Sequence, residues 1–261
     1  MSSDVIRRGC ENMEKGRKEA RIGLDSEEKI ICKINSDERF RNSLKECLAK
    51  LGFNLEREIK AQRNDLKTDI LIKIDSNIGI SVKTSTGTSF HNLDRRSLED
   101  WKRRLNMPND VFEIMKEAIL RVARNKRDKF ILEKDRSIIR DFFAKHLKSI
   151  LEEIFTRGEK SLQLLMIIDE HNKKVYVFRM ADVINFIYRD ASSKISFSKK
   201  GIIRLGDFIT IQRKGGDGKH VTIPKTYWEH PGNQLQFKFS PLKFVKYIEE
   251  TKPIEFCTIS Y

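Results

Sequence analysis

The sequence predicts a mixed α/β or α+β domain. The apolar pattern gives a helix, three short strands, a long helical block, further strands and a last helix, in that order. No internal repeat or low-complexity tract is present. The 261 residues are enough for one large domain with a substantial buried core, so we expect a single domain over residues 1–261.

The first element is an N-terminal arm or helix. Residues 1–35 begin with a charged stretch that has few large apolar side chains. A second helix is expected to start with Ser36 or Asp37 as its cap and to stop at Gly52, because apolar residues recur between them at helical spacing. The stretch LEREIK, residues 55–60, is a short strand candidate.

Two strands joined by a turn follow in TDILIKIDSNIGISVKTST. Residues 68–74 and 78–84 are rich in apolar side chains. The turn chemistry is supplied by Asp75, Ser76, Asn77 and Gly79. Because the chain reverses between the strands, the start of the first is expected to lie beside the end of the second.

The C-terminal two-thirds begins with helices and then changes to strands. Helical spacing predicts helices over residues 93–105, 111–126 and 135–155. Strands are predicted over residues 162–169 and 174–180, and a short helix over 181–190. The stretch up to residue 240 is mostly strand and turn, and a last helix is predicted over 241–250.

The charge balance favours a polyanionic partner. Lys and Arg number 52 against 38 Asp and Glu, which gives a formal net charge of +14. Such an excess creates a positive field over much of a protein surface and attracts nucleic acid. The alternative is a surface that serves solubility alone, or a Lys-rich composition typical of the source organism.

The cysteines and the apolar segments indicate a soluble intracellular protein. Four cysteines lie far apart with no CxxC pair, so we expect reduced thiols and a cytoplasmic location. The N-terminal stretch has no apolar segment typical of a signal peptide, and no run approaches the length of a membrane span. No membrane partner is therefore expected.

Several catalytic motifs are absent. The stretch ending in GGDGKH differs from a phosphate-binding loop, because Arg213 replaces the first glycine and His220 replaces the Ser or Thr. There is no GxSxG elbow and no HExxH motif. His91 has no second metal ligand at a suitable spacing, which argues against a histidine-based nuclease.

Asp69 and Lys83 form a candidate catalytic pair. Phosphodiester hydrolysis calls for a divalent metal that neutralises charge and activates water. Mg²⁺ binds one or two carboxylates and keeps several waters, and a lysine adds positive charge for the developing oxyanion. The alternative is that Asp69 merely caps a strand and Lys83 is solvated.

Asp69 followed by the S-V-K of Ser81–Lys83 resembles the Asp…(Asp/Glu)-x-Lys core of PD-(D/E)xK nucleases, particularly type II restriction endonucleases. The resemblance implies a restriction-endonuclease-like core of helix, three-stranded meander, helix and strand. That core would span residues 36–105, with a helical segment over 106–157 and a β-rich DNA-reading part over 158–261. It also implies Mg²⁺, double-stranded DNA as substrate, a homodimer and a prokaryotic restriction-modification system.

Ser81 departs from that motif, because a hydroxyl cannot bind a metal as a carboxylate does. Some enzymes of the family bring the missing acid from the following helix, which makes Glu99 or Asp100 a candidate. Glu46, on the preceding helix, is another. The alternative for Glu99 is an exposed helix glutamate that pairs with a nearby arginine.

Two strands have the pattern of a base-reading surface. In ITIQRK and QLQFKF, polar side chains alternate with apolar ones, so amides and lysines share one face. The alternative is a half-exposed sheet in a basic protein. The loop after Lys83 is a further candidate. The predicted DNA-binding residues are Ser85, Thr86, Thr88, His91, Gln212, Arg213, Lys214, Gln234, Gln236 and Lys238.

Two other functions are compatible with the same residues. One is a structure-selective nuclease on the same core, such as a junction resolvase or a repair enzyme. The other is a catalytically inactive protein that keeps the fold and binds nucleic acid. A cleavage assay with a divalent metal separates the inactive protein from the two nucleases.

Overall fold

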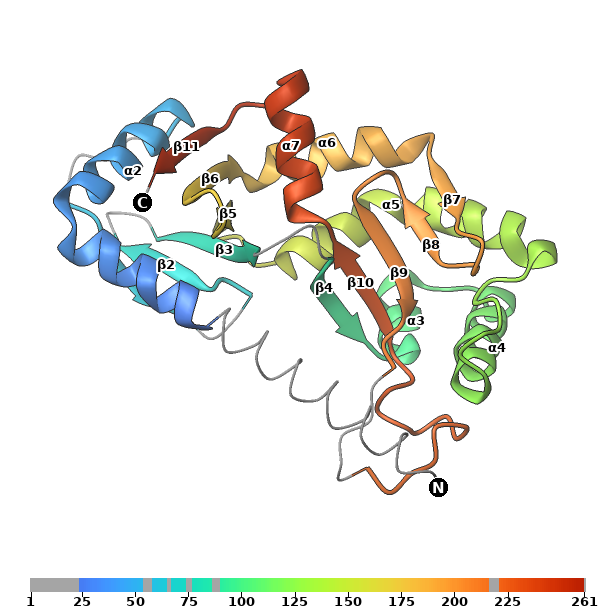
Figure 1. Cartoon of the computed structure of the whole chain (residues 1–261). Coiled ribbons are helices and arrows are strands. Elements are labelled where there is room, and N and C mark those ends of the chain that lie inside the picture. The colour runs from blue at the N-terminus through green and yellow to red at the C-terminus, as the bar shows by residue number, and fades with distance from the viewer. Residues whose placement is uncertain are drawn as a thin grey trace. The chain divides into compact units, whose positions relative to one another are not determined.

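The computed structural model describes residues 24–53, 58–64, 67–73, 77–85, 90–215 and 221–260. It has the predicted mixed α/β architecture with two sheets (Figure 1). The described residues divide into two compact units, each built from segments that are distant in sequence. The first unit contains described residues up to 85 together with 156–186 and 241–260, and the second contains 90–155 and 187–240.

A six-stranded sheet forms the centre of the first unit, in the order β1-β2-β3-β5-β6-β11. Its strands are β1 (Lys60–Arg63), β2 (Ile70–Lys73), β3 (Ile78–Ser85), β5 (Leu162–Asp169), β6 (Lys174–Arg179) and β11 (Cys257–Ser260). β3 pairs with β5 in parallel, and every other neighbouring pair is antiparallel. β3 and β5 are buried along most of their length, as expected for a parallel pair at the centre of a sheet.

Helices cover this sheet. Residues 24–36 are helical, and α2 (Glu38–Lys50) follows with Asp37 as its N-cap, as predicted. Ile30 and Ile34 of the first helix and Leu44 of α2 join β-strand residues in one buried apolar cluster. The unit also contains α7 (Pro241–Thr251) and the start of α6 (Met180–Ser192).

The second unit has a five-stranded antiparallel sheet in the order β4-β10-β9-β8-β7 (Figure 1). Its strands are β4 (His91–Arg96), β7 (Ile195–Phe197), β8 (Ile203–Leu205), β9 (Ile209–Arg213) and β10 (Leu235–Phe239). Its helical elements are α3 (Leu98–Leu105), α4 (Asn109–Arg124), the 3₁₀ turn η1 (Glu133–Asp135) and most of α5 (Arg136–Thr156). None of the helices described is both long and apolar enough to cross a bilayer.

One face of the second sheet is buried against aromatic side chains of the helices. The ring centroid of Phe237 lies 4.9 Å from that of Trp101, and Phe239 lies 5.7 Å from Phe155. The opposite face carries the polar residues of β9 and β10. The predicted alternation of these two strands is therefore confirmed.

Two predicted elements differ from the structure. The helix predicted from residue 93 begins only at Leu98, with Ser97 as N-cap, and the preceding residues form β4. β4 pairs with the distant β10, a contact that helical spacing in the sequence does not reveal. The strand predicted over 55–60 starts at Lys60 as β1, and residues 54–57 lie outside the described residues.

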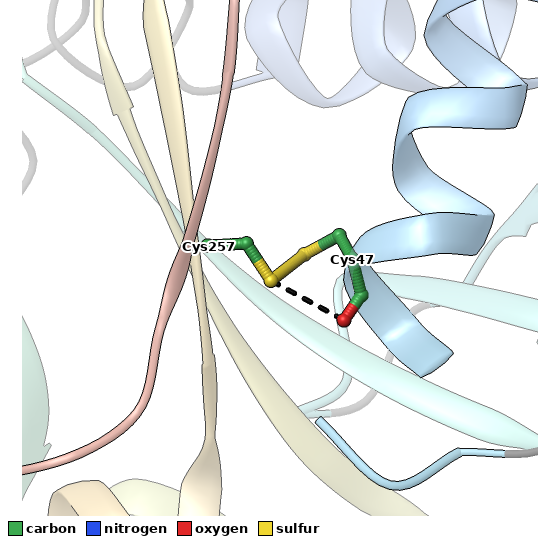
Figure 2. The surroundings of a disulfide bond; sticks show 2 residues. All are labelled: Cys47 and Cys257. Atoms are coloured by element: carbon green, nitrogen blue, oxygen red, sulfur yellow. Dashed lines mark hydrogen bonds between the residues drawn. A yellow bond between two sulfur atoms is a disulfide. The ribbon is translucent and has the colours of Figure 1, made fainter. Parts of the chain in front are cut away.

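The prediction of reduced cysteines is wrong for one pair. Cys47 of α2 and Cys257 of β11 form a disulfide, with their Cα atoms 5.6 Å apart (Figure 2). The packing of α2 beside the last strand also places Cys257 Sγ 3.2 Å from the carbonyl oxygen of Cys47. Exposed Cys32 is not disulfide-bonded. The spacing of the cysteines is therefore not evidence that the protein works in a reducing compartment.

Breaking this disulfide is expected to destabilise the first unit. The bond joins residues 210 positions apart, and constraining so long a loop in the unfolded chain contributes about 3–5 kcal/mol. We expect Cys47→Ser to lower the free energy of unfolding by this amount in urea titrations without reductant. Dithiothreitol should lower the wild type to the same level, and Cys32→Ser should have no effect. Identical unfolding with and without dithiothreitol would show that the bond does not form in solution.

Candidate active site on β2 and β3

The structure brings Asp69 and Lys83 together at one end of the β2–β3 pair. Asp69 directly precedes β2, and its backbone N–H donates to the carbonyl oxygen of Ile80 at 2.9 Å. Ile70 is the register partner of Ile80. This antiparallel register places Asp69 next to the Ser81–Lys83 stretch of β3, and the Lys83 ammonium lies 3.5 Å from the Asp69 carboxylate.

Ser81 links the two charged groups. Its hydroxyl donates to Asp69 Oδ2 at 3.1 Å and accepts from Lys83 Nζ at 2.8 Å. Lys83 Nζ also donates to the Val82 carbonyl oxygen at 2.7 Å. The side chains of Lys83 and Asp69 are 14% and 23% exposed, so both are held in place but remain accessible. Ser81 therefore orients the lysine and the aspartate where a second carboxylate was expected.

Asp69 also has a structural role. Its Oδ2 accepts from the Val82 backbone N–H at 2.5 Å, where β2 no longer supplies a partner to β3. A charge-assisted bond of this kind supports the strand end whether or not the site is catalytic. The Asp69–Lys83 pair alone is thus compatible with both interpretations, and a third ionisable group interacts with the pair.

That third group is Glu27, on the helix over residues 24–36. Glu27, Ile30 and Ile34 follow helical spacing, and the two isoleucines are buried in the core of the unit. The pKa of the Glu27 carboxyl is raised to about 7, first by partial burial and then by repulsion from Asp69, although Lys83 opposes the shift. The helix therefore holds a second carboxylate near the aspartate and the lysine.

These residues fit a hard divalent cation. Mg²⁺ in proteins commonly takes one or two carboxylates and fills its remaining positions with water and substrate phosphate. Burial, together with repulsion from Asp69, makes the ionised form of Glu27 less favourable, and a cation bound beside this carboxyl would favour its ionised form. Among the described residues, no group of three or more His, Cys, Asp or Glu side chains could hold a metal ion by itself.

The acids predicted to replace Ser81 have other surroundings in the structure, and their predicted role stays a prediction. Glu46 is exposed on α2, next to the disulfide-bonded Cys47. Glu99 is on α3 in the second unit, where its carboxylate accepts a hydrogen bond from the Trp228 indole. Asp100, on the same helix, pairs with Arg103.

The predicted DNA-binding residues fall into three groups. Gln212 of β9 and Gln236 and Lys238 of β10 lie on the polar face of the second sheet, and Gln234 and Lys214 continue that pattern beyond the strand ends. Two residues are buried: Ser85, at the end of β3, and Arg213, whose Nε donates to Asn233 at 2.8 Å. His91 is half-buried on β4, and Thr86 and Thr88 lie outside the described residues.

The sequence did contain a signal for Glu27. In EEKIICKIN, the glutamate precedes two isoleucines at helical spacing, which places it at the end of a buried stripe. The prediction of an N-terminal arm or helix over residues 1–35 did not include this stripe. An acidic residue at the first position of an apolar stripe is expected at the rim of the core, where partial burial perturbs its pKa.

Most of the chain resembles an experimentally determined restriction endonuclease. The crystal structure of restriction endonuclease MspI in complex with its cognate DNA matches with a TM-score of 0.57 at 14% sequence identity, over 87% of this chain and 92% of that chain. The protein therefore has a restriction-endonuclease-like fold, as the resemblance of the motif implied. Comparisons by sequence gave no match, either to a protein family or to a curated protein.

Proposed function

We propose that the protein is a Mg²⁺-dependent endonuclease that cuts double-stranded DNA at a short specific sequence, in the manner of a type II restriction endonuclease. The observation that carries the proposal is the cluster of Asp69, Ser81, Lys83 and Glu27 in a restriction-endonuclease-like fold. The net charge of +14 supports a polyanionic substrate.

Asp69 and Glu27 are the residues that would hold the cation. A bound Mg²⁺ would supply Lewis-acid stabilisation and lower the pKa of a coordinated water. Glu27 must lose its proton to bind a cation, so cation binding is coupled to the raised pKa of this side chain.

Lys83 would stabilise the charge that develops on the phosphate. Its ammonium is held by Ser81 and the Val82 carbonyl, which leaves a compact positive charge at a fixed position. A preorganised donor of this kind acts without reorganising during the reaction. Ser81 is thus a positioning residue, and it keeps the lysine beside the aspartate.

The second unit would bind and read the DNA. Its sheet exposes amides and cations on one face, and Lys214 lies near enough to Arg95 that burial and repulsion from this arginine lower the pKa of the lysine. Phosphates relieve such repulsion between neighbouring cations. A palindromic target would call for two copies of the chain, so we include a homodimer in the proposal, together with a role in a prokaryotic restriction-modification system.

A plasmid cleavage assay tests this function. We expect the protein to convert supercoiled and linear plasmid to discrete fragments with Mg²⁺ and to leave both intact with EDTA. Preferential cutting of a four-way junction over linear duplex would indicate a structure-selective nuclease instead. DNA binding with no cleavage in the presence of any divalent metal ion would indicate an inactive DNA-binding protein.

A further inference from the structure

β4 contains a β-bulge that changes which side chains face outward. Phe237 of β10 pairs with Asp94, but the next residue, Lys238, pairs with Asn92, so Leu93 is the extra residue. Leu93 and Asp94 are 4% and 0% exposed and both point inward. Regular alternation would place Asn92 and Arg95 on opposite faces, whereas the bulge leaves both of them exposed.

The bulge also determines which charged residues of β4 are buried and which are exposed. The Asp94 carboxylate is buried, 3.0 Å from the guanidinium of Arg96, so the one acid of the strand is kept away from the exposed face. The exposed face receives Arg95, a cation, and Asn92, an amide. β4 is an edge strand of the described sheet, and an edge bulge alone can serve to discourage pairing with another strand. The bulge by itself therefore does not indicate a ligand.

The neighbours of the two exposed residues supply the second observation. Arg95 is the register partner of Gln236, which in turn pairs with Gln212 of β9, and Asn92 is opposite Lys238. β10 lies between β4 and β9 (Figure 1). The register of the three strands therefore places these side chains in one continuous polar row. Gln236 Nε2 donates to Asn92 Oδ1 at 3.0 Å, which fixes the two amides relative to each other.

The coupled amides present a defined hydrogen-bonding pattern. Gln236 Nε2 and Asn92 Oδ1 are hydrogen-bonded to each other. The Gln236 side-chain oxygen therefore remains as an acceptor, and the Asn92 amide nitrogen remains as a donor. Adenine presents the complementary pair in the major groove, an N6 donor and an N7 acceptor. The Arg95 guanidinium, beside this pair, matches the O6 and N7 acceptors of guanine.

We propose that Asn92 and Arg95 are specificity-determining residues, with Arg95 reading a guanine and the Asn92–Gln236 pair reading an adenine in the major groove. This inference rests on the proposed function and adds two residues of β4 to it. The recognition sequence consequently contains at least one G·C pair and one A·T pair. The bulge is the backbone feature that brings these residues onto the reading face.

A binding-site selection from random duplexes tests the inference, with Lys83→Ala as the parent protein so that no DNA is cut. The parent should select one short motif containing both kinds of base pair. Arg95→Ala should reduce discrimination at one G·C position by about 5- to 150-fold. Arg95→Lys keeps the charge but not the two-pronged donor, so it should retain affinity for scrambled duplex while it loses the same discrimination.

Substituting the two amides should change the selected motif at a different position. Asn92→Ala and Gln236→Ala should relax preference at the same A·T position, and the double variant should lose no more than the larger single loss, because each amide positions the other. Lys200→Ala, in an exposed turn of the same unit, should weaken binding to all duplexes alike and leave the motif unchanged.

Two outcomes separate the claims. If the parent selects a motif and both Arg95→Ala and Asn92→Ala select the same motif with undiminished preference, the inference is wrong and the proposed function stands. If the parent selects no motif at any salt concentration, sequence-specific binding itself fails, and the role of the β4 residues fails with it.

Discussion

Lys83→Ala is expected to reduce the rate of Mg²⁺-dependent DNA cleavage by about 100- to 1,000-fold, the loss typical of removing one preorganised charge-stabilising donor. Asp69→Asn should be at least as damaging, because it removes a carboxylate from the proposed cation site. The asparagine keeps an oxygen that can accept from the Val82 N–H, so the strand end stays supported. Both variants should bind DNA within a few-fold of the wild type.

Single-turnover cleavage of preformed protein–DNA complexes measures these rates without a contribution from product release. Lys73→Ala is the matched control, because Lys73 is an exposed lysine at the other end of β2. It should cleave at the wild-type rate. Wild-type cleavage by Lys83→Ala would remove this hairpin from the active site, whatever the activity of the protein as a whole.

Glu27→Gln is expected to raise the Mg²⁺ concentration for half-maximal cleavage by more than about tenfold, because an amide replaces one of two anionic ligands. The physical reason is that the Glu27 carboxyl interacts electrostatically with Asp69 and Lys83. Titration of the cleavage rate with MgCl₂ measures the effect. Glu28→Gln is the matched control, because Glu28 is exposed and lies 3.6 Å from Arg63.

The same MgCl₂ titration tests whether Glu46 or Glu99 contributes to the proposed cation site. Glu46→Gln and Glu99→Gln should keep the wild-type Mg²⁺ requirement, since Glu46 is exposed on α2 and Glu99 accepts from the Trp228 indole in the second unit. A raised requirement for either variant, with Glu27→Gln unaffected, would transfer the second ligand position to that acid.

Features set by contacts between nearby residues could be predicted from the sequence. Asp69 and Lys83 belong to one hairpin, so turn chemistry and strand spacing were enough to place them together. The alternation of β9 and β10 is likewise a property of each strand alone. The short motif on the hairpin, with the order of elements around it, also identified the fold.

Features set by long-range packing could not be predicted in this way. The interaction of Glu27 with Asp69 and Lys83 depends on a whole helix that docks on the sheet through Ile30 and Ile34. The hydrogen bond between Asn92 and Gln236 joins residues 144 positions apart, and the bulge that permits it depends on the register with β10. The disulfide is the extreme case, because α2 meets the last strand only in the folded chain.

The position of Ser81 illustrates the difference between a motif and a site. The motif has a carboxylate there, and its absence suggested that an acid from another helix binds the metal. In the structure the hydroxyl bridges Lys83 and Asp69, so the position still organises the site although it offers no negative charge. Glu27, on a helix that precedes the sheet, interacts electrostatically with both charged residues of the pair.

Mapping the ends of digested DNA tests the central claim most directly. Genomic DNA is incubated with purified wild type or with Lys83→Ala prepared in the same way, with Mg²⁺ or EDTA, and the new ends are sequenced. We predict that wild type with Mg²⁺ produces ends at a fixed distance from one short shared sequence, and that the other three samples produce none. Ends without a shared sequence, or equal cutting by Lys83→Ala, would contradict a sequence-specific nuclease site on β2 and β3.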